Sequence, residues 1–255
     1  MSRIQGLYKN AVAAVSPIMH TWINFDVTGE ENLPESGGFL VTPNHISNTD
    51  PVCVAFVLGE LGIPTRFMAK NELFKVPVLG AVMKKLGMVP VLRNSSHSVD
   101  SLAGARKALD AGQCVGIYIE GTLTRDPQYW PMRGKTGAAR LALDTRCPVI
   151  PIAQWGPQAI LERYSKALDI RPGRKVRMII MEPVDLSDLY SDQGSQDREA
   201  VVEATERIQK AITRGVEELR GEKAPEQPWD PDKMQGPAKK TLGRFGRWRR
   251  GVQGR

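Results

Sequence analysis

Hydrophobic residues along the chain follow two patterns: short apolar runs, and longer stretches with apolar positions at helical spacing. Short runs bounded by turn residues are typical of buried strands, and helical spacing is typical of amphipathic helices. The predicted strands are GFLVTP (38–43), TRFMA (65–69), MVPVL (88–92), CVGIYI (114–119), PVIPIA (148–153) and KVRMIIM (175–181). The predicted helices span 51–61, 72–86, 99–111, 136–144 and 197–220. This order predicts an α/β fold, a single mostly parallel or mixed sheet covered by helices.

The N-terminal segment, residues 1–24, reads as a separate amphipathic helix. Its apolar positions recur at helical spacing. They are Ile4, Leu7, Tyr8, Ala11, Val15, Ile18, Met19 and Trp22. Pro17 should kink or divide this helix, because proline lacks a backbone N–H. The segment is too polar and too short to span a bilayer, so it either packs on the core or lies in the headgroup layer.

The chain is long enough for one α/β domain over residues 25–222, and we expect residues 223–255 to form a linker and a basic tail. The formal net charge is +7, and the seven basic residues of the tail equal that excess. They are Lys239, Lys240, Arg244, Arg247, Arg249, Arg250 and Arg255. Leu242, Phe245 and Trp248 recur between them, as in basic segments that bind anionic membrane surfaces. A solvated tail is the alternative.

Three cysteines, Cys53, Cys114 and Cys147, lie in apolar contexts without short spacing. They are expected to be buried thiols rather than a disulfide framework, and the chain has too few histidines and paired cysteines to suggest a metal site. This cysteine use, and an N-terminus without a signal-peptide cleavage pattern, favour a reducing cytosol.

The stretch TPNHISNTDPV, residues 42–52, joins a predicted strand to a predicted helix and contains Asn44, His45 and Asp50. On a tight turn the Asp50 carboxylate can accept a hydrogen bond from one imidazole nitrogen of His45 and make the other more basic. An ordinary loop histidine, with Asp50 as the N-cap of the next helix, is the simpler alternative.

The spacing of Asn44, His45 and Asp50 resembles the first motif of the glycerolipid acyltransferases, and of the 1-acylglycerol-3-phosphate acyltransferases in particular. Further blocks of that family follow in order along the chain. They are Ala69-Lys70 with Glu72-Leu73, Gly87 with Arg93, Glu120-Gly121-Thr122, and the CPVIPIA run with Pro151. The resemblance covers residues 44–153 and implies acyl transfer, with no serine elbow or reactive cysteine that would favour a covalent intermediate.

The resemblance implies that His45 is the general base, oriented by Asp50, and that Asn44 or a backbone N–H stabilises the oxyanion. Lys70, Arg93, Glu120, Gly121, Thr122 and Arg125 are the predicted substrate-binding residues. The family usually has arginine after the threonine, where this chain has Leu123. Arg125, or else Lys135, is the expected replacement for that phosphate ligand. Apolar helices over 54–61 and 73–86 would line an acyl channel.

The implied reaction acylates lysophosphatidate to phosphatidic acid in phospholipid biosynthesis. The co-substrate would be acyl-CoA or acyl carrier protein, without a further cofactor. An acceptor such as glycerol-3-phosphate, a lysophospholipid or a glycolipid is the alternative. The expected location is the cytoplasmic face of the plasma membrane, peripheral or monotopic. A basic nucleic-acid-binding protein is a rival, but the basic charge is confined to the tail and leaves the ordered motifs unexplained, so no nucleic acid partner is expected.

Overall fold

A computed structural model describes residues 3–91, 98–231 and 233 of the chain. Seven strands form one mixed sheet in the order β1-β7-β6-β2-β5-β3-β4. They are β1 (Ile23–Thr28), β2 (Phe39–Pro43), β3 (Thr65–Lys70), β4 (Val89–Val91), β5 (Cys114–Gly116), β6 (Val149–Trp155) and β7 (Arg174–Ile180). All neighbours pair in parallel except β6 and β7. The predicted α/β class is therefore confirmed, and the sheet is mixed.

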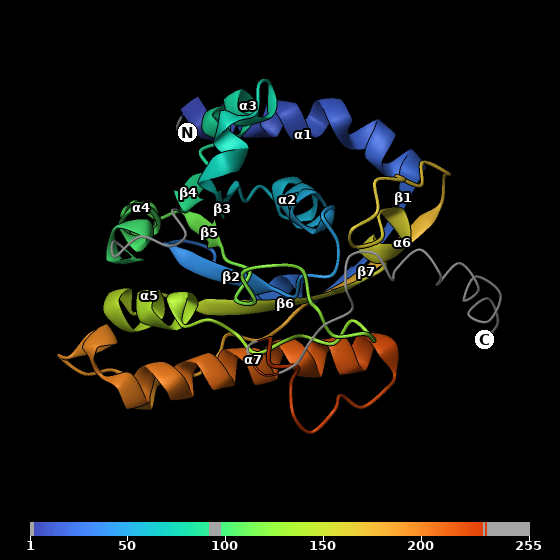
Figure 1. Cartoon of the computed structure of the whole chain (residues 1–255). Coiled ribbons are helices and arrows are strands. Elements are labelled where there is room, and N and C mark those ends of the chain that lie inside the picture. The colour runs from blue at the N-terminus through green and yellow to red at the C-terminus, as the bar shows by residue number, and fades with distance from the viewer. Residues whose placement is uncertain (1–2, 92–97, 232, 234–255) are drawn as a thin grey trace.

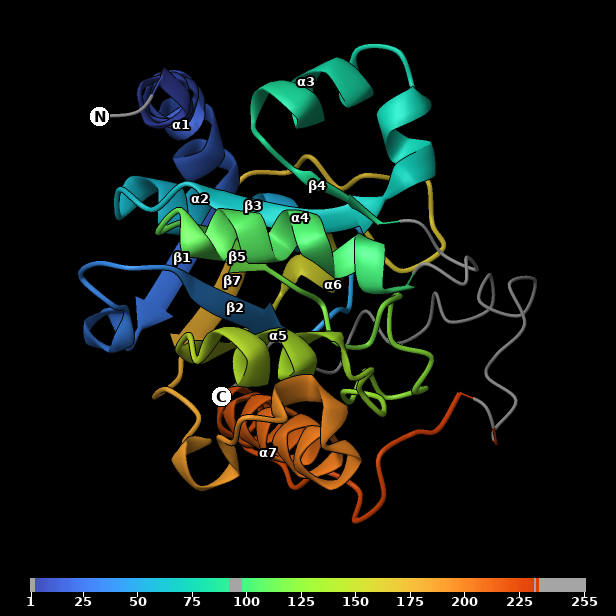
Figure 2. The ribbon, with the colours of Figure 1, turned by 90° about the vertical axis from the view of Figure 1, so that its left-hand side faces the viewer.

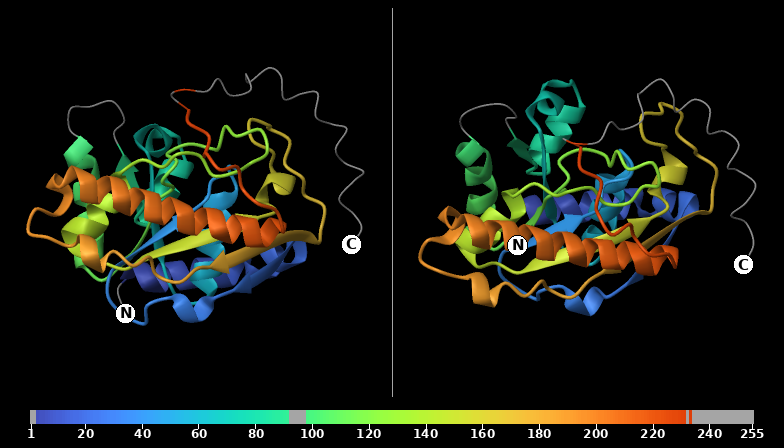
Figure 3. Two further views of the ribbon diagram at one scale, coloured as in Figure 1. Left: turned by 90° about the horizontal axis from the view of Figure 1, so that it is seen from below. Right: turned by 60° about the horizontal axis from the view of Figure 1, so that its bottom comes forward.

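Helices cover both faces of the sheet (Figure 1). They are α1 (Arg3–Trp22), α2 (Asp50–Glu60), α3 (Leu79–Lys85), α4 (Ser98–Asp110), α5 (Gly137–Thr145), α6 (Pro157–Ile160) and α7 (Arg198–Arg220). On one face, α4, α5 and α7 form a core with Leu40, Val115 and Val149. On the other, α2 packs against Val41, Phe67 and Ile150. Seen from below, α7 runs along the sheet (Figure 3).

Alternating side chains explain why the central strands are buried on both sides. In β2, Leu40 faces α5 and α7, whereas Phe39 and Val41 face α2. Each of these side chains is at most 4% exposed. A parallel sheet between two helical layers needs apolar side chains on both faces, which is why β2 reads as a continuous apolar run.

The boundaries of α7 follow from its caps. The side chain of Asp197 accepts hydrogen bonds from the backbone N–H groups of Glu199 and Ala200, and Gly221 ends the helix with a positive φ of 65°. Aspartate at the N-cap and glycine at the C-terminal end satisfy backbone groups that a helix leaves unpaired. The helix predicted over 197–220 is confirmed within one residue.

Two predicted helices differ from the structure. Helix α1 is continuous through Pro17, so of the two expected effects of this proline, a kink or a division, the division is wrong. The helix expected over 72–86 is interrupted: the 3₁₀ helix η2 (Asn71–Lys75) precedes α3, and Val76, Pro77 and Val78 separate them. Pro77 cannot donate to a helical ladder, which explains this break.

The first strand, β1, was missing from the prediction. Its side chains alternate between the core and solvent, and its neighbour β7 pairs with it in parallel. The chain enters β1 directly from α1 without a turn between them. The local pattern of apolar residues therefore does not show that the helix ends and a strand begins at Ile23. The short 3₁₀ helices η1 (Glu30–Asn32), η3 (Ser187–Leu189) and η4 (Gly194–Gln196) complete the described elements.

The predicted linker has contacts with the domain in its described part. The backbone N–H of Arg133 donates to the carbonyl of Trp229 at 2.9 Å, and the Arg133 guanidinium donates to the Asp230 carboxylate at 3.2 Å. The predicted basic tail, residues 236–255, lies outside the described residues. Among the helices that the structure describes, none combines the length and apolar character required to cross a bilayer.

Candidate active site

The sheet topology brings two loops that carry the sequence motifs to one edge. Strands β2, β5 and β3 are parallel neighbours, so their carboxyl ends lie at the same edge. The chain leaves β2 at Pro43 into the His45 loop, and leaves β5 at Gly116 into the loop that contains Glu120. The carboxyl edge of a largely parallel sheet is the usual position of a ligand site in α/β folds.

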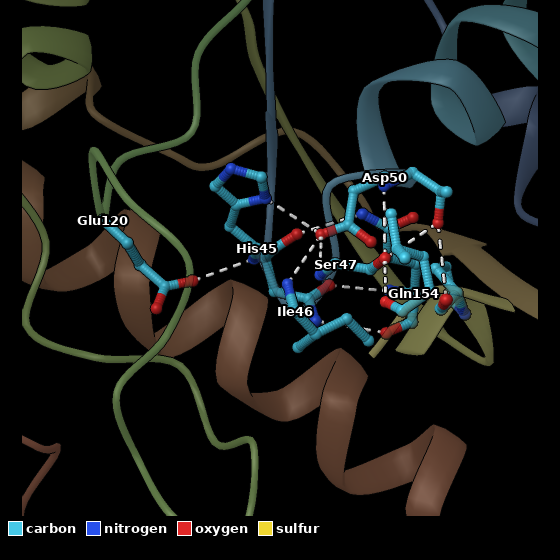
Figure 4. A network of polar contacts seen from close by, with 10 residues as sticks. His45, Ile46, Ser47, Asp50, Glu120 and Gln154 are labelled. Carbon is cyan, nitrogen blue, oxygen red and sulfur yellow. Dashed lines mark hydrogen bonds and ion pairs between the residues drawn. The ribbon is translucent and has the colours of Figure 1, made fainter. Parts of the chain in front are cut away.

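The Asp50 carboxylate is the centre of the His45 loop (Figure 4). Its Oδ2 atom lies 2.9 Å from Nδ1 of His45, and it accepts hydrogen bonds from the backbone N–H groups of Ile46 at 2.6 Å and Ser47 at 2.8 Å. Asp50 is fully buried at the first turn of α2. Asp50 therefore orients the imidazole of His45. The alternative, Asp50 as the N-cap of the helix, is wrong, because Thr49 is the N-cap and the Asp50 side chain accepts from N–H groups that precede the helix.

Burial raises the pKa of Asp50, and the contacts with His45, Ser47 and Ile46 oppose that rise. With Nδ1 held by the carboxylate, Nε2 is the nitrogen of His45 free to react. No protein group within the described residues is in hydrogen-bond contact with Nε2. The His45 side chain is 16% exposed, so the ring is largely shielded from solvent.

Tyr118 forms one wall beside His45. The two rings are stacked with centroids 4.1 Å apart and an interplanar angle of 29°, and Phe67 of β3 also stacks with Tyr118. Burial raises the pKa of the Tyr118 hydroxyl well above its ordinary value. A neutral aromatic face against His45 fixes the ring plane without adding a charge.

Glu120 connects the two loops. Its Oε1 accepts a hydrogen bond from the backbone N–H of His45 at 2.9 Å, and its Oε2 accepts one from the N–H of Met132 at 3.0 Å. Burial raises the pKa of Glu120 to about 8. The carboxylate is 3% exposed, so in this structure it holds backbone in position rather than facing solvent. Its predicted substrate contact stays a prediction.

Asn44 is engaged with β6. Its side-chain amide donates to the carbonyl of Gln154 at 3.1 Å and accepts from the Gln154 N–H at 2.8 Å. The Gln154 side chain returns a hydrogen bond to the Asn44 carbonyl at 3.0 Å. Both ends of the Asn44 amide are thus used to support the loop, which argues for a structural role rather than oxyanion binding.

The other predicted binding residues lie at different distances from His45 and differ in exposure. Lys70 is exposed at the carboxyl end of β3, two strands from β2, which corresponds to roughly 10 Å across the sheet. Gly121 has a positive φ of 68°, and the aliphatic chain of Lys135 packs beside it. Thr122 is half-buried and Arg125 is exposed in the same loop. Arg93 lies outside the described residues.

Arg163, which the sequence analysis did not single out, is 2% exposed and supports the Glu120 loop. Its guanidinium donates to the carbonyls of Thr124 at 2.8 Å, Asp126 at 2.6 Å and Pro127 at 3.3 Å. The Thr124 N–H in turn donates to the His45 carbonyl at 2.7 Å. A single arginine in a loop has no pattern that would reveal such a role.

Of the two apolar stretches expected to line an acyl channel, 54–61 packs into the core, and the role of 73–86 stays a prediction. Val54, Val57 and Leu58 of α2 are at most 5% exposed and pack against the sheet.

The cysteines are free and buried, as predicted. The described residues include no group of three or more histidine, cysteine and acidic side chains arranged to hold a metal ion.

The fold and the site together define a class of protein: an α/β domain whose mixed sheet carries a histidine–aspartate pair at its carboxyl edge. Comparison with known proteins identifies this class. The Acyltransferase family model matches residues 24–155, just over half of the chain, and the chain belongs to this family. The predicted family is thereby confirmed.

Three relatives show how far the likeness extends. A 1-acyl-sn-glycerol-3-phosphate acyltransferase of Bacillus subtilis (strain 168) is 28% identical over 213 residues, which cover 84% of this chain and all of that protein. A chloroplastic enzyme of the same name from Brassica napus is 33% identical over 66% of this chain, which spans about half (48%) of that protein. The crystal structure of the 1-acyl-sn-glycerophosphate acyltransferase PlsC from Thermotoga maritima has a TM-score of 0.62 at 26% identity, covering 87% of this chain and 80% of that one.

Proposed function

We propose that this acyltransferase moves a fatty acyl group from an acyl thioester to the free hydroxyl of 1-acylglycerol-3-phosphate, forming phosphatidic acid. The proposal is supported by the relatives that bear this activity in their names and by the likeness to PlsC. The observation that carries the chemistry is the 2.9 Å contact between Nδ1 of His45 and the buried Asp50 carboxylate.

His45 acts as the general base in this mechanism. Nε2 removes the proton of the acceptor hydroxyl as the hydroxyl oxygen attacks the thioester carbonyl. The C–S bond then breaks, and the imidazolium returns the proton to the thiolate that leaves. Asp50 stabilises the imidazolium, and a positioned base of this kind contributes about 10²–10⁴-fold to the rate.

The acceptor phosphate needs cationic donors at the same edge of the sheet. Lys70, Arg125 and Lys135 are exposed cations in these loops, and Arg93, also predicted to bind the phosphate, lies outside the described residues. Leu123, which stands where the family usually has arginine, is 6% exposed and buried in the loop. We therefore assign the phosphate to these cations. An acceptor with another headgroup is the second candidate, and Leu123 is the reason to test it.

The donor is acyl-CoA or acyl carrier protein, and the lipid acceptor brings the enzyme to an anionic membrane surface. We place the protein there as a peripheral or monotopic protein on the cytoplasmic face, without a further cofactor.

Release of free thiol from palmitoyl- or oleoyl-coenzyme A, measured with a panel of acceptors, tests the proposal. Release that requires lysophosphatidate confirms the acceptor, and release with a different acceptor keeps the His45 chemistry but changes the substrate. A folded His45→Ala variant should lose activity. Full activity in that variant would overturn the mechanism, and absence of release with both acyl-CoA and acyl carrier protein donors would overturn the function.

A further inference from the structure

Exposed apolar side chains gather on one short segment that the proposed chemistry does not use. We call residues 71–85, which comprise η2, the connection and α3, the η2–α3 element. Leu73, Val76, Val78 and Val82 are 39%, 45%, 78% and 45% exposed. Four large apolar side chains exposed within ten residues are unusual for a soluble surface, where such side chains are normally scattered singly.

The backbone at Val78 is strained. Its φ of 65° and ψ of −60° correspond to a γ-turn of the rare, strained kind, and a β-branched residue is a poor choice for this conformation. The Val78 side chain is also the most exposed of the four, so burial in the fold does not compensate for the strain. Backbone strain that no packing within the protein offsets is typical of residues that serve a function, such as binding a partner, and not the stability of the fold.

Close packing holds the element in one shape. A Cβ atom on Gly80 would lie 2.1 Å from the carbonyl oxygen of Phe74, so α3 packs directly on the backbone of η2. The N–H groups of Gly80 and Val82 donate to the carbonyls of Val76 and Val78 at 2.8 and 2.9 Å. The apolar side chains of the connection are therefore presented by a preformed scaffold.

The charges around these side chains favour an anionic partner. Lys75, Lys84 and Lys85 are exposed on the element, and Glu72 is its acidic residue. Apolar side chains flanked by lysines match the boundary between lipid headgroups and acyl chains, where the apolar groups insert and the cations lie among phosphates.

The element lies on the same side of the molecule as α1, and α7 lies on the opposite side, in both views (Figures 1 and 2). Helix α1 exposes Val15 and Ile18 by 43% and 69%. The element also follows directly after Lys70, at the carboxyl edge of the sheet that holds the His45 loop. A lipid surface in contact with this side would lie next to the edge where a lipid acceptor must enter.

We propose that the η2–α3 element docks on an anionic lipid bilayer, with Val76, Val78 and Val82 in the headgroup–acyl boundary and Lys75, Lys84 and Lys85 on lipid phosphates. This inference rests on the proposed function, because docking serves to bring a lipid acceptor to His45. Its test requires no catalysis, so the two proposals can fail separately.

Sedimentation with phosphatidylcholine vesicles that contain roughly a third phosphatidylglycerol tests the docking surface. The full chain and its Val78→Glu variant are compared, and Val202→Glu is the matched control. Val202 is a valine of α7 that is 53% exposed, and α7 lies on the opposite side of the molecule from α3 (Figure 1). All variants retain the basic residues 236–255, so any difference arises elsewhere. We expect Val78→Glu to weaken vesicle partitioning at least tenfold and Val202→Glu to leave it unchanged.

Val78→Gly separates the strain from the apolar contact. Glycine adopts a positive φ without cost, so this variant should unfold at a higher temperature than the wild type while binding vesicles more weakly. Equal partitioning of the wild type, Val78→Glu and Val78→Gly would overturn the proposal. A wild-type dimer that Val78→Glu dissociates, measured by analytical ultracentrifugation, would also overturn it and assign the surface to a second copy of the chain.

Discussion

The carboxylate of Glu120 accepts a hydrogen bond from the backbone N–H of His45 at 2.9 Å. The contact joins residues far apart in the sequence, and it ties the Glu-Gly-Thr motif to the backbone of the His45 loop rather than to its imidazole. Because the second carboxylate oxygen holds the N–H of Met132, Glu120 fixes three loop segments relative to one another. The position of the His45 loop, and with it the geometry of the His45–Asp50 pair, therefore depends on Glu120. The hydrogen bonds of Glu120 go to backbone N–H groups and not to the His45 or Asp50 side chain.

The raised pKa of Glu120 predicts a pH-dependent stability with a definite sign. Burial raises that pKa to about 8, against roughly 4.3 in an unfolded chain. Between these values the folded protein binds the proton more strongly, so the contribution of Glu120 to the free energy of unfolding falls as pH rises and levels off above about 8. The expected slope is roughly 1 kcal/mol per pH unit.

Urea unfolding of the wild type and Glu120→Gln at several pH values between about 5 and 9 measures this slope. Glutamine does not titrate, so the free energy of unfolding of the wild type minus that of Glu120→Gln isolates the carboxyl group from other titrations. This difference should decrease as pH rises. An increase with pH would instead show an ionised carboxylate stabilised by the N–H groups of His45 and Met132.

Asp50→Asn should separate the orienting role of Asp50 from its charge. The asparagine oxygen can keep the contacts with His45, Ile46 and Ser47, whereas the amide cannot stabilise an imidazolium. We expect kcat to fall by about 10²-fold or more while the fold is retained. Its new N–H₂ group would take the place of Oδ1, which has no hydrogen-bond partner within the described residues, at a cost of about 1–3 kcal/mol.

Thiol release with saturating substrates gives kcat, and circular dichroism with urea unfolding gives the fold and its stability. A variant that keeps the wild-type kcat would show that the Asp50 charge is unnecessary and that Asp50 serves only to hold the backbone of the His45 loop.

The stack of Tyr118 on His45 predicts that a flat ring is required at position 118 and the hydroxyl is not. Tyr118→Phe keeps the ring 4.1 Å from the imidazole and should leave kcat within about twofold of the wild type, whereas Tyr118→Leu loses the aromatic face and should lower it by about tenfold. Equal activity in Tyr118→Phe and Tyr118→Leu would assign the ring to packing alone.

Local patterns were enough to predict much of this fold and the centre of the site. Asp50 follows His45 by five residues on one turn, so the contact between them depends on short-range geometry. The apolar run of β2 and the caps of α7 are local in the same sense. Side-chain types and spacing therefore predict such features directly.

Contacts between distant segments could not be predicted in this way. The antiparallel pairing of β7 with β6 and the position of β1 at the sheet edge depend on the whole topology. Glu120 was predicted to bind substrate, and its hydrogen bonds to the N–H groups of His45 and Met132 depend on contacts between loops far apart in the sequence. Gln154 gave a weak indication, because a polar side chain at the end of the apolar strand β6 needs a buried partner, which is Asn44.

Arg163 should be among the most sensitive positions for stability. Its buried guanidinium satisfies three carbonyls of the Glu120 loop and lies 4.1 Å from the centre of the Tyr129 ring. Arg163→Ala leaves these carbonyls without their donor and should lower the free energy of unfolding by about 3 kcal/mol. Lysine keeps the charge but not the planar fork, so Arg163→Lys should lie between the wild type and alanine.

Arg171→Ala is the matched control, because Arg171 is exposed and pairs with Asp169 at the surface, where an ion pair adds little to stability. Urea unfolding of the three variants gives the order. Because the Thr124 N–H donates to the His45 carbonyl, loosening the Glu120 loop should also lower kcat in Arg163→Ala under conditions where the variant remains folded. Stability equal to that of Arg171→Ala would show that the loop keeps its shape without Arg163, and an unchanged kcat would show that its shape does not position His45.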